Sequence, residues 1–273
     1  MTDISFSAFD RCGKLSITVD SSNEKFCAEN GALYDKNKTE LILCRGEQSG
    51  SFTVPDSVKN IGNKAFLACG NLTEIIIPSG VTRIGSLAFE GCDSLVNIEI
   101  PDTVKTIGGG AFRDCKKLET IKLPKVMDNI GDYAFENCES LTSVELPGGM
   151  ARVQPFLFYH CKKLKDVKIS SGTIDICNAS FTACSSIVSL TIPSSLRSVW
   201  ANVFLDDAPL SDIYYEGTQQ QWDGTALRKP LSFMIIRQTY PYRCYPPLPQ
   251  STTLKVWISG LKPLFGTAEH MCR

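Results

Sequence analysis

Apolar and polar positions along this chain recur with a constant period, and residues 72–92 illustrate one cycle of it. Leu72, Ile75 and Ile77 are apolar and are separated by positions such as Glu74, which is the spacing of a strand with one buried face. Pro78 follows at once, and proline ends a central strand because it has no N–H to donate. The pattern predicts a short strand that ends at Pro78.

The second half of the cycle turns the chain back. Val81 and Ile84 return to the core, and Gly85 permits a bend without strain at Cβ. Ser86–Cys92 is expected to form a short helical or 3₁₀ turn that packs Phe89 and Cys92 inward. One such coil cannot bury its own apolar edge, whereas stacked coils bury a continuous core. We therefore expect a solenoid with a parallel β-sheet on one face and short helical turns on the other.

Four columns of residues keep the same 23-residue step. They are Phe66, Phe89, Phe112, Phe135, Phe158, Phe181 and Phe204; Cys69, Cys92, Cys115, Cys138, Cys161 and Cys184; Pro55, Pro78, Pro101, Pro124, Pro147 and Pro193, with Ser170 as the exception; and Leu72, Leu95, Leu118, Leu141, Leu164, Ile187 and Leu210. A period of 20–29 residues with an L-x-x-I-x-I segment is the signature of a leucine-rich-repeat solenoid.

The full cycle, L-x-x-I-x-I-P-x-x-V-x-x-I-G-x-x-A-F-x-x-C, resembles the BspA-like leucine-rich repeat from about residue 50 to 205. Residues 31–44 resemble the early hairpin of such proteins, residues 5–19 a shortened first coil, and residues 213–222 the segment that closes the array. The resemblance implies a surface or secreted protein that acts in adhesion or host interaction.

We expect one repeat domain over residues 1–228, closed by segment 213–228. Thr218 and Gln221 fit a capping box that would start a helix and lay Trp222 and Ala226 over the last coil. From residue 150 onward the Ile-Gly pair of the cycle disappears, which is typical of terminal, capping repeats.

Residues 229–273 lose the period, hold six Lys/Arg against one acid, and place four prolines in 241–249. They are interpreted as a tail, a linker or a shifted reading frame that is dispensable for folding. The competing interpretation makes 232–236 a last strand over the open edge of the sheet.

The spacing of the cysteine and histidine residues does not indicate a metal site or a catalytic site. The cysteine column lacks the C-x₂-C spacing of zinc sites, and neighbouring coils place cysteines too far apart for ordinary disulfide geometry. We expect these thiols to be buried and reduced, and any disulfide to fall among Cys12, Cys27, Cys44, Cys177, Cys244 and Cys272. With two histidines, His160 and His270, and no phosphate loop or nucleophile motif, no enzyme, cofactor or metal is expected.

Two groups of outward positions are candidate partner-binding residues. The first lies on the strand face and comprises Glu99, Lys122, Glu145, Lys168 and Tyr214 of the column that runs Ile76, Glu99, Lys122, Glu145, Lys168, Thr191 and Tyr214, in which the four charged residues alternate in sign. Mutual neutralisation explains that alternation as well as binding does. The second is the cluster Tyr133, Phe156, Tyr159 and His160 on the turn face. Exposed aromatic groups mark contact sites, although these rings could equally pack over an irregular coil.

Composition and charge argue against some classes of function. A net charge of −1 and the lack of a basic strip argue against nucleic acid, and no apolar run reaches the ~18 residues of a membrane span. We predict a non-enzymatic protein-binding or adhesion module whose partner is a protein or glycoprotein of the extracellular matrix or host surface. The alternative is an architectural stalk or fragment of a larger surface protein. The resemblance favours the cell surface, while the lack of a visible signal peptide leaves an intracellular protein or a truncated start open.

Overall fold

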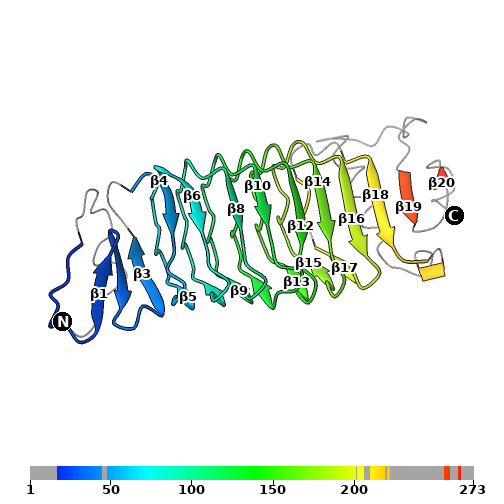
Figure 1. Ribbon diagram of the computed structural model, residues 1–273. Helices are drawn as coiled ribbons and strands as arrows, with labels where there is room; N and C mark the ends of the chain where they lie inside the picture. Colours follow the sequence, from blue (N-terminus) through cyan, green and yellow to red (C-terminus); the bar gives the residue numbers. More distant parts are fainter. Residues whose placement is uncertain are drawn as a thin grey trace.

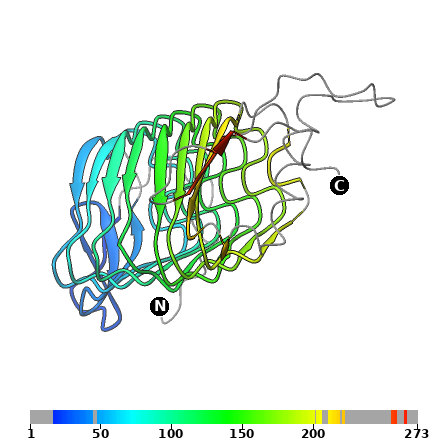
Figure 2. The ribbon, with the colours of Figure 1, turned by 90° about the vertical axis from the view of Figure 1, so that its right-hand side faces the viewer.

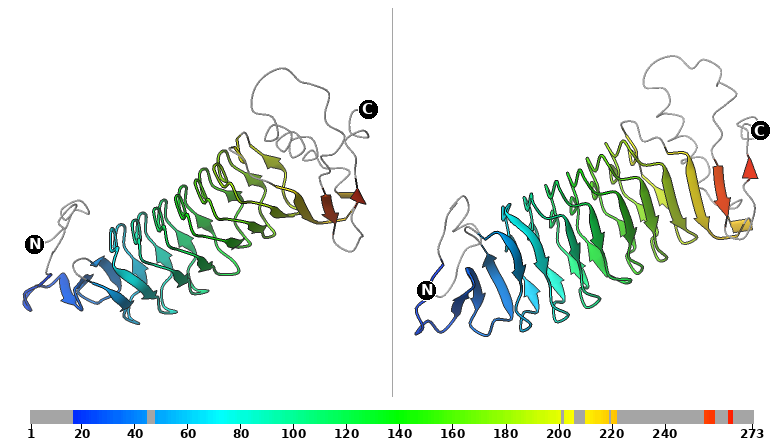
Figure 3. Two further views of the ribbon diagram at one scale, coloured as in Figure 1. Left: turned by 90° about the horizontal axis from the view of Figure 1, so that it is seen from above. Right: turned by 45° about the horizontal axis from the view of Figure 1, so that its top comes forward.

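The computed structural model describes residues 17–44, 48–200, 202–205, 210–218 and 220–221, and the backbone of 255–258 and 264–265. Over this range the chain forms an elongated solenoid of stacked coils, which runs from an N-terminal hairpin to the strand β18 (Figures 1 and 3). Seen from another side, successive coils keep nearly the same outline (Figure 2). The predicted leucine-rich-repeat solenoid is confirmed.

Each coil contributes a long strand to one side of the array. These strands are β4 (Gly50–Thr53), β6 (Leu72–Ile76), β8 (Asn97–Glu99), β10 (Thr120–Lys122), β12 (Ser143–Leu146), β14 (Asp166–Ile169), β16 (Ser189–Pro193) and β18 (Asp212–Glu216). They pair in parallel as β4–β6, β8–β10 and β12–β14–β16–β18. Within the last group the register joins residues one period apart, as Val144 with Val167 and Val167 with Leu190.

A second set of parallel strands was not predicted. These are the two-residue strands β5 (Asn60–Ile61), β7 (Arg83–Ile84), β9 (Thr106–Ile107), β11 (Asn129–Ile130), β13 (Arg152–Val153), β15 (Asp175–Ile176) and β17 (Ser198–Val199). They contain the apolar residue of the Ile-Gly position, which is Ile in most coils and Val in β13 and β17, and which the sequence placed in the core without assigning a strand. Two residues are too few for the alternation that identifies a strand.

The core is a row of stacked rings. Adjacent phenylalanines from Phe66 to Phe204 lie 5.0 to 5.5 Å apart between centroids, with planes within 14° of parallel. All seven side chains are buried, as are the Leu and Cys columns beside them. The predicted inward columns are therefore confirmed.

The turn segments are not confirmed as helices. In the coil of Phe112, the N–H groups of Gly110, Phe112 and Asp114 donate to carbonyls of the next coil at 2.8 to 2.9 Å. The alternating N–H groups, such as those of Arg113 and Cys115, donate within the coil to the residue three positions earlier. An α-helix would use all of these donors internally. The turn is therefore joined to the neighbouring coil by backbone hydrogen bonds, and it lacks the continuous hydrogen-bond pattern of a helix.

This arrangement requires two left-handed residues in each turn. They form columns that include Lys64, Leu87, Tyr133, Phe156 and Ala179, with φ near 55–60°, and Asp114, Asn137 and His160, with φ of 58–63°. Non-glycine residues adopt this conformation at a cost of about 1–2 kcal/mol each. The inter-coil hydrogen bonds and the buried rings offset that cost.

Close approach between coils explains the glycine of the Ile-Gly pair. A Cβ at Gly108 or Gly131 would lie 2.4 Å from the backbone N of Ser86 or Gly109 in the preceding coil. Gln154 takes this position in the next coil, and there β11 does not pair with β13, nor β10 with β12. Gln154 Nε2 instead donates to Asn129 Oδ1 at 3.0 Å. We call this boundary between the coils of β11 and β13 the seam. Full coils continue beyond it, and there β13, β15 and β17 pair although Gln154, Cys177 and Trp200 replace the glycine.

The predicted hairpin within 31–44 is confirmed as β2 (Ala32–Asp35) and β3 (Glu40–Cys44), which are antiparallel. A further strand, β1 (Phe26–Glu29), pairs with β2, and β3 pairs in parallel with β5. The hairpin therefore joins the array directly by extending the sheet of short strands. Residues 5–16 of the expected first coil lie outside the described residues.

The predicted capping box is confirmed at the other end. Thr218 N donates to Gln221 Oε1 at 2.8 Å, and Gln221 N donates to Thr218 Oγ1 at 3.2 Å. Trp222, Ala226 and segment 232–236 lie outside the described residues. The edge of β18 instead pairs in parallel with β19 (Lys255–Ile258), which pairs with β20 (Leu264–Phe265). Residues 229–273 thus supply an additional strand that the sequence did not predict.

The cysteine column is hydrogen-bonded as well as buried. From Cys92 to Cys184 each thiol of the column donates to the carbonyl of a phenylalanine in the preceding coil, as Cys115 Sγ to Phe89 O at 3.2 Å, whereas Cys69 Sγ donates to Cys44 O at 3.0 Å. The column cysteines are free thiols, as predicted, and Cys27, Cys44 and Cys177, the described cysteines outside the column, are free as well. Burial raises the pKa of the Cys92, Cys115 and Cys138 thiols above the ordinary value.

Replacing Phe135 with Ala should destabilise the array by about 3–5 kcal/mol, because it removes a fully buried ring from the middle of the stack. Chemical denaturation would measure the change in free energy of unfolding, and Phe135→Leu should lose less. A Phe135→Ala protein with the parent's midpoint and slope would contradict the role of the stack.

The array should lose stability as the pH rises above about 8.5, the ordinary thiol pKa. Between that pH and the higher folded-state pKa, the unfolded chain binds fewer protons than the folded one, so the free energy of unfolding falls. For each thiol the slope is at most about 1.4 kcal/mol per pH unit. Denaturation at several pH values should give Cys115→Ala a shallower decline than the parent, and an identical slope would exclude this linkage.

Candidate functional site

The aromatic residues predicted on the turn face form one connected group, which we call the aromatic ridge (Tyr133, Phe156, Tyr159 and His160). Tyr133 and Phe156 stack with centroids 4.7 Å apart and planes at 3°. Tyr159 meets Phe156 edge to face at 5.7 Å and stacks on His160 at 4.2 Å. All four side chains are half-buried. The structure therefore brings these candidates together, with the rings partly in contact with solvent and partly with one another.

The repeat backbone explains this geometry. Tyr133 and Phe156 occupy equivalent left-handed positions, with φ of 56° and 57°, in coils on either side of the seam. Equivalent backbone positions project side chains in parallel, so the two rings face each other across the seam. Here the ring contact adds to the turn hydrogen bonds of Phe135 N to Leu157 O and Asn137 N to Tyr159 O.

Arg113 belongs to this surface, although sequence reasoning missed it. Its guanidinium carbon lies 5.4 Å from the centroid of the Tyr133 ring. Arg113 Nε is 2.8 Å from Glu136 Oε2, and Nη1 is 3.5 Å from Glu90 Oε1. Gly110 has a φ of 62°, and a Cβ there would lie 2.4 Å from Leu87 Cδ2 in the preceding coil. The 23-residue spacing of Glu90, Arg113 and Glu136 was the available signal.

The strand-face column forms two separate ion pairs. Lys122 pairs with Glu99, and Lys168 Nζ lies 2.7 Å from Glu145 Oε1. Hydrogen bonding to these carboxylates raises the pKa of both lysines, so they stay charged at neutral pH. No ion pair joins Lys122 to Glu145 in the described structure, which agrees with the unpaired strands β10 and β12 between them. Such exposed pairs contribute little to stability.

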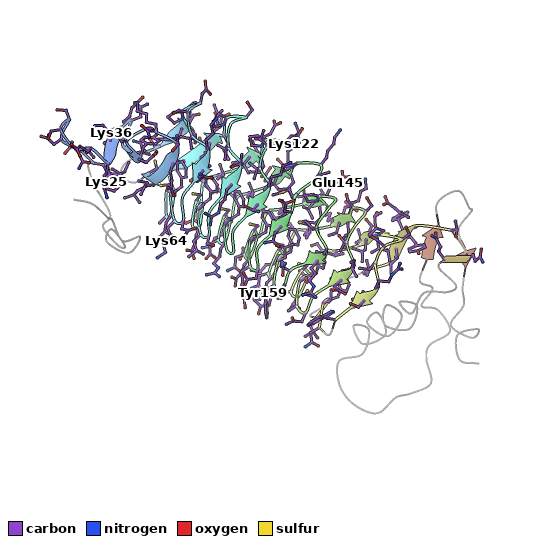
Figure 4. All side chains as sticks on the ribbon, turned by 90° about the horizontal axis from the view of Figure 1, so that it is seen from below. Lys25, Lys36, Lys64, Lys122, Glu145 and Tyr159 are labelled. Carbon is purple, nitrogen blue, oxygen red and sulfur yellow. The ribbon has the colours of Figure 1, made fainter. Side chains whose placement is uncertain are left out.

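A shallow hollow of about 230 Å³ lies on this strand face, over β12, β14 and β16. Its lining includes the Glu145 and Lys168 pair, Asp166, Ser189 and Thr191. Tyr214 follows Thr191 in the strand register and is 40% exposed. Figure 4 shows Lys122 and Glu145 on one margin of the array and Tyr159 on the other. The two candidate groups therefore belong to different surfaces.

Within the described residues, no cluster of three or more His, Cys, Asp or Glu side chains could hold a metal ion. No described helix has the length and apolar character needed to cross a membrane.

Comparison with known proteins identifies the repeat. The family model described as the BspA type leucine rich repeat region matches residues 43–155 and 110–229, with 6 copies. No curated protein matches the chain.

The fold is found in several solved structures. A leucine-rich repeat protein from Eubacterium ventriosum is 25% identical with a TM-score of 0.63; the match covers 92% of this chain and 59% of that one. The pneumococcal vaccine antigen PcpA is 20% identical with a TM-score of 0.55, over 76% of this chain and 46% of that one. A leucine rich cell surface protein from Faecalibacterium prausnitzii is 17% identical with a TM-score of 0.50, over 75% and 98% respectively. This chain thus spans little more than half the length of the Eubacterium ventriosum protein.

The contact between Tyr133 and Phe156 should be measurable as a coupling of about 0.5–1.5 kcal/mol, the usual range for stacked aromatic pairs. A double-mutant cycle with Tyr133→Leu and Phe156→Leu, followed by chemical denaturation, would give this value. Tyr133→Leu with Tyr214→Leu on the strand face is the matched control and should be additive. Additivity in the first pair as well would show that the rings do not stabilise the seam.

Proposed function

We propose that this chain, which belongs to the BspA-type leucine-rich repeat family, is a non-enzymatic module that binds a protein partner through its aromatic ridge. The larger protein that contains it would act at a cell surface, in adhesion or host interaction. The surface setting is supported by the family and by the cell surface protein and the vaccine antigen that share the fold.

The observation that carries this proposal is the grouping of two tyrosines, a phenylalanine, a histidine and Arg113 on one stretch of the turn face. Tyrosine and arginine are enriched among the residues that dominate binding energy in protein interfaces. The rings also hold one another in place, which lowers the side-chain entropy lost on binding. A partner would therefore bind to a surface whose side chains are already held in place.

The strand face is the second candidate. Glu99, Lys122, Glu145 and Lys168 are engaged in ion pairs, and the hollow beside them is smaller than the ~300–1,000 Å³ typical of small-molecule sites. Paired, exposed charges supply less binding energy than desolvated aromatic groups. We therefore rank this face below the aromatic ridge.

A binding screen tests the proposal. The full chain would be immobilised and presented with purified extracellular-matrix and host-surface proteins, and affinities measured by surface plasmon resonance. For a partner that binds saturably, Tyr159→Leu with Phe156→Leu should weaken binding by about tenfold or more. The matched control, Tyr214→Leu with Glu145→Gln, should leave affinity nearly unchanged.

The opposite pattern, with loss only in the control variant, would transfer the function to the strand face. The absence of any saturable partner would favour the architectural stalk over a binding module.

A further inference from the structure

We infer that the partner segment that meets the aromatic ridge is acidic and carries an apolar side chain. The apolar side chain would pack on the rings, and the carboxylates would face Lys163 and Lys165, which we call the lysine corner. This inference rests on the proposed function and deepens it, because it assigns a chemistry to the partner of that same surface.

The lysine corner follows the aromatic ridge directly along the chain. Tyr159 and His160 lead into a turn at residues 161–164, which Leu164 N closes by donating to the carbonyl of residue 161 at 3.1 Å. Lys163 lies inside this turn and Lys165 just after it, and both residues are exposed. One extended segment of a partner can therefore contact both the rings and the lysines.

The charges of this coil favour an anionic segment. Residues 151–165 contain no acid and four basic residues, which are Arg152, Lys162, Lys163 and Lys165. Arg152 Nε lies 3.2 Å from Asp175 Oδ2, and Lys162 Nζ lies 2.9 Å from Glu139 Oε1, so these two cations are neutralised within the array. In the part of the chain that the structure describes, the lysine corner takes part in no ion pair.

The neighbouring coils leave the lysine corner uncompensated. Lys165 N donates to Thr142 O at 2.8 Å, and Val188 N donates to Lys165 O at 3.0 Å, so two neutral residues flank Lys165. The residues one period before and after Lys163 are also neutral, and they are Ser140 and Ser186. A carboxylate placed at the corner would therefore meet two cations whose charge no adjacent side chain offsets.

Asp166, the next acid along the chain, does not reverse this balance. It accepts a hydrogen bond from Ser189 Oγ at 2.6 Å, and over residues 151–168 it is the one acid against five Lys/Arg. An anionic segment would be attracted to this surface, whereas a cationic segment would be repelled by it.

The side of the ridge that faces the next coil is open to an apolar side chain. Tyr133 covers one face of Phe156. One period after Phe156, Tyr159 and His160 the side chains are small, and they belong to Ala179, Thr182 and Ala183. Phe156 and Ala179 share the left-handed backbone, with φ of 57° and 55°, so a methyl group stands where a further ring would extend the stack. An apolar partner side chain would bury ring surface there, and such contacts contribute most of the binding energy of protein interfaces.

The test uses labelled peptides of about twelve residues that share two central leucines and carry glutamate, glutamine or lysine on both sides. Their binding to the full chain would be followed by fluorescence anisotropy at low ionic strength. The glutamate peptide should bind about three- to tenfold more tightly than the glutamine peptide, because two exposed charge pairs add to the same apolar contact. The lysine peptide should bind weakest. The three affinities should converge at about 1 M salt, where the screening length is ~3 Å.

Variants separate the two parts of the surface. Lys163→Gln with Lys165→Gln should abolish the preference for glutamate over glutamine. The matched control, Lys105→Gln with Lys117→Gln, removes the same net charge and should keep the preference, although Lys117 occupies the position of Lys163 two coils earlier. Tyr159→Leu should weaken the glutamate and glutamine peptides alike. Thermal melts would establish that each variant is folded.

The inference would be overturned by equal affinity of the glutamate and glutamine peptides, or by no measurable binding of the glutamate peptide at millimolar concentration. A preference that survives in the folded Lys163→Gln, Lys165→Gln protein would overturn it as well. Heparin binding that depends on the lysine corner, without binding of the glutamate peptide, would assign the corner to a sulfated glycan instead. In each case a protein partner whose binding depends on Tyr159 would leave the proposed function standing, so the two failures are distinguishable.

Discussion

Backbone hydrogen bonding between successive turns is the constraint on which the rest of this structure depends. Donors such as Gly110 N and Phe112 N reach carbonyls of the next coil, and this holds equivalent residues side by side at every period. The arrangement requires left-handed residues, as at Tyr133 and His160, and a glycine such as Gly131 where coils approach closely. Once these hold, the phenylalanines must stack and the thiols must face phenylalanine carbonyls.

The same constraint determines the chemistry of the surface. Outward residues one period apart meet directly, so ion pairs such as Lys168 with Glu145 and ring stacks such as Tyr133 with Phe156 follow from sequence spacing alone. A change in one outward residue therefore alters contacts with the coils on both sides. Function in such an array depends on which side chains occupy the outward columns, because the inward columns vary little.

Much of the fold could be predicted from the sequence, because a pattern of apolar positions that is weak in one coil recurs in every repeat and can then be recognised. The buried columns, the hairpin of β2 and β3 and the capping box of Thr218 with Gln221 were all identified in this way. The short strands cannot be recognised because two residues carry no period, and the sequence predicts helical turns because the i to i+3 spacing of apolar residues also suits a helix. Arg113 was missed because its contact with the Tyr133 ring depends on side-chain placement, and β19 because its segment has lost the repeat. The grouping of the aromatic residues was predictable from their spacing, whereas their half-buried state depends on stacking that only coordinates show.

Because only part of the aromatic ridge lies across the seam, substitutions at different residues can separate its structural role from its role in binding. At the seam β11 and β13 do not pair, and the facing rings of Tyr133 and Phe156 add side-chain contact to the turn hydrogen bonds that cross it. Arg113 instead covers the far side of Tyr133, and the rings of Tyr159 and His160 stack on each other within one coil. Leucine at Tyr133 would remove part of the seam contact, whereas leucine at Tyr159 removes only stacking surface and a hydroxyl. A Tyr159→Leu protein that loses binding but keeps its stability would therefore show that the aromatic ridge binds a partner, because a purely structural role does not produce that result.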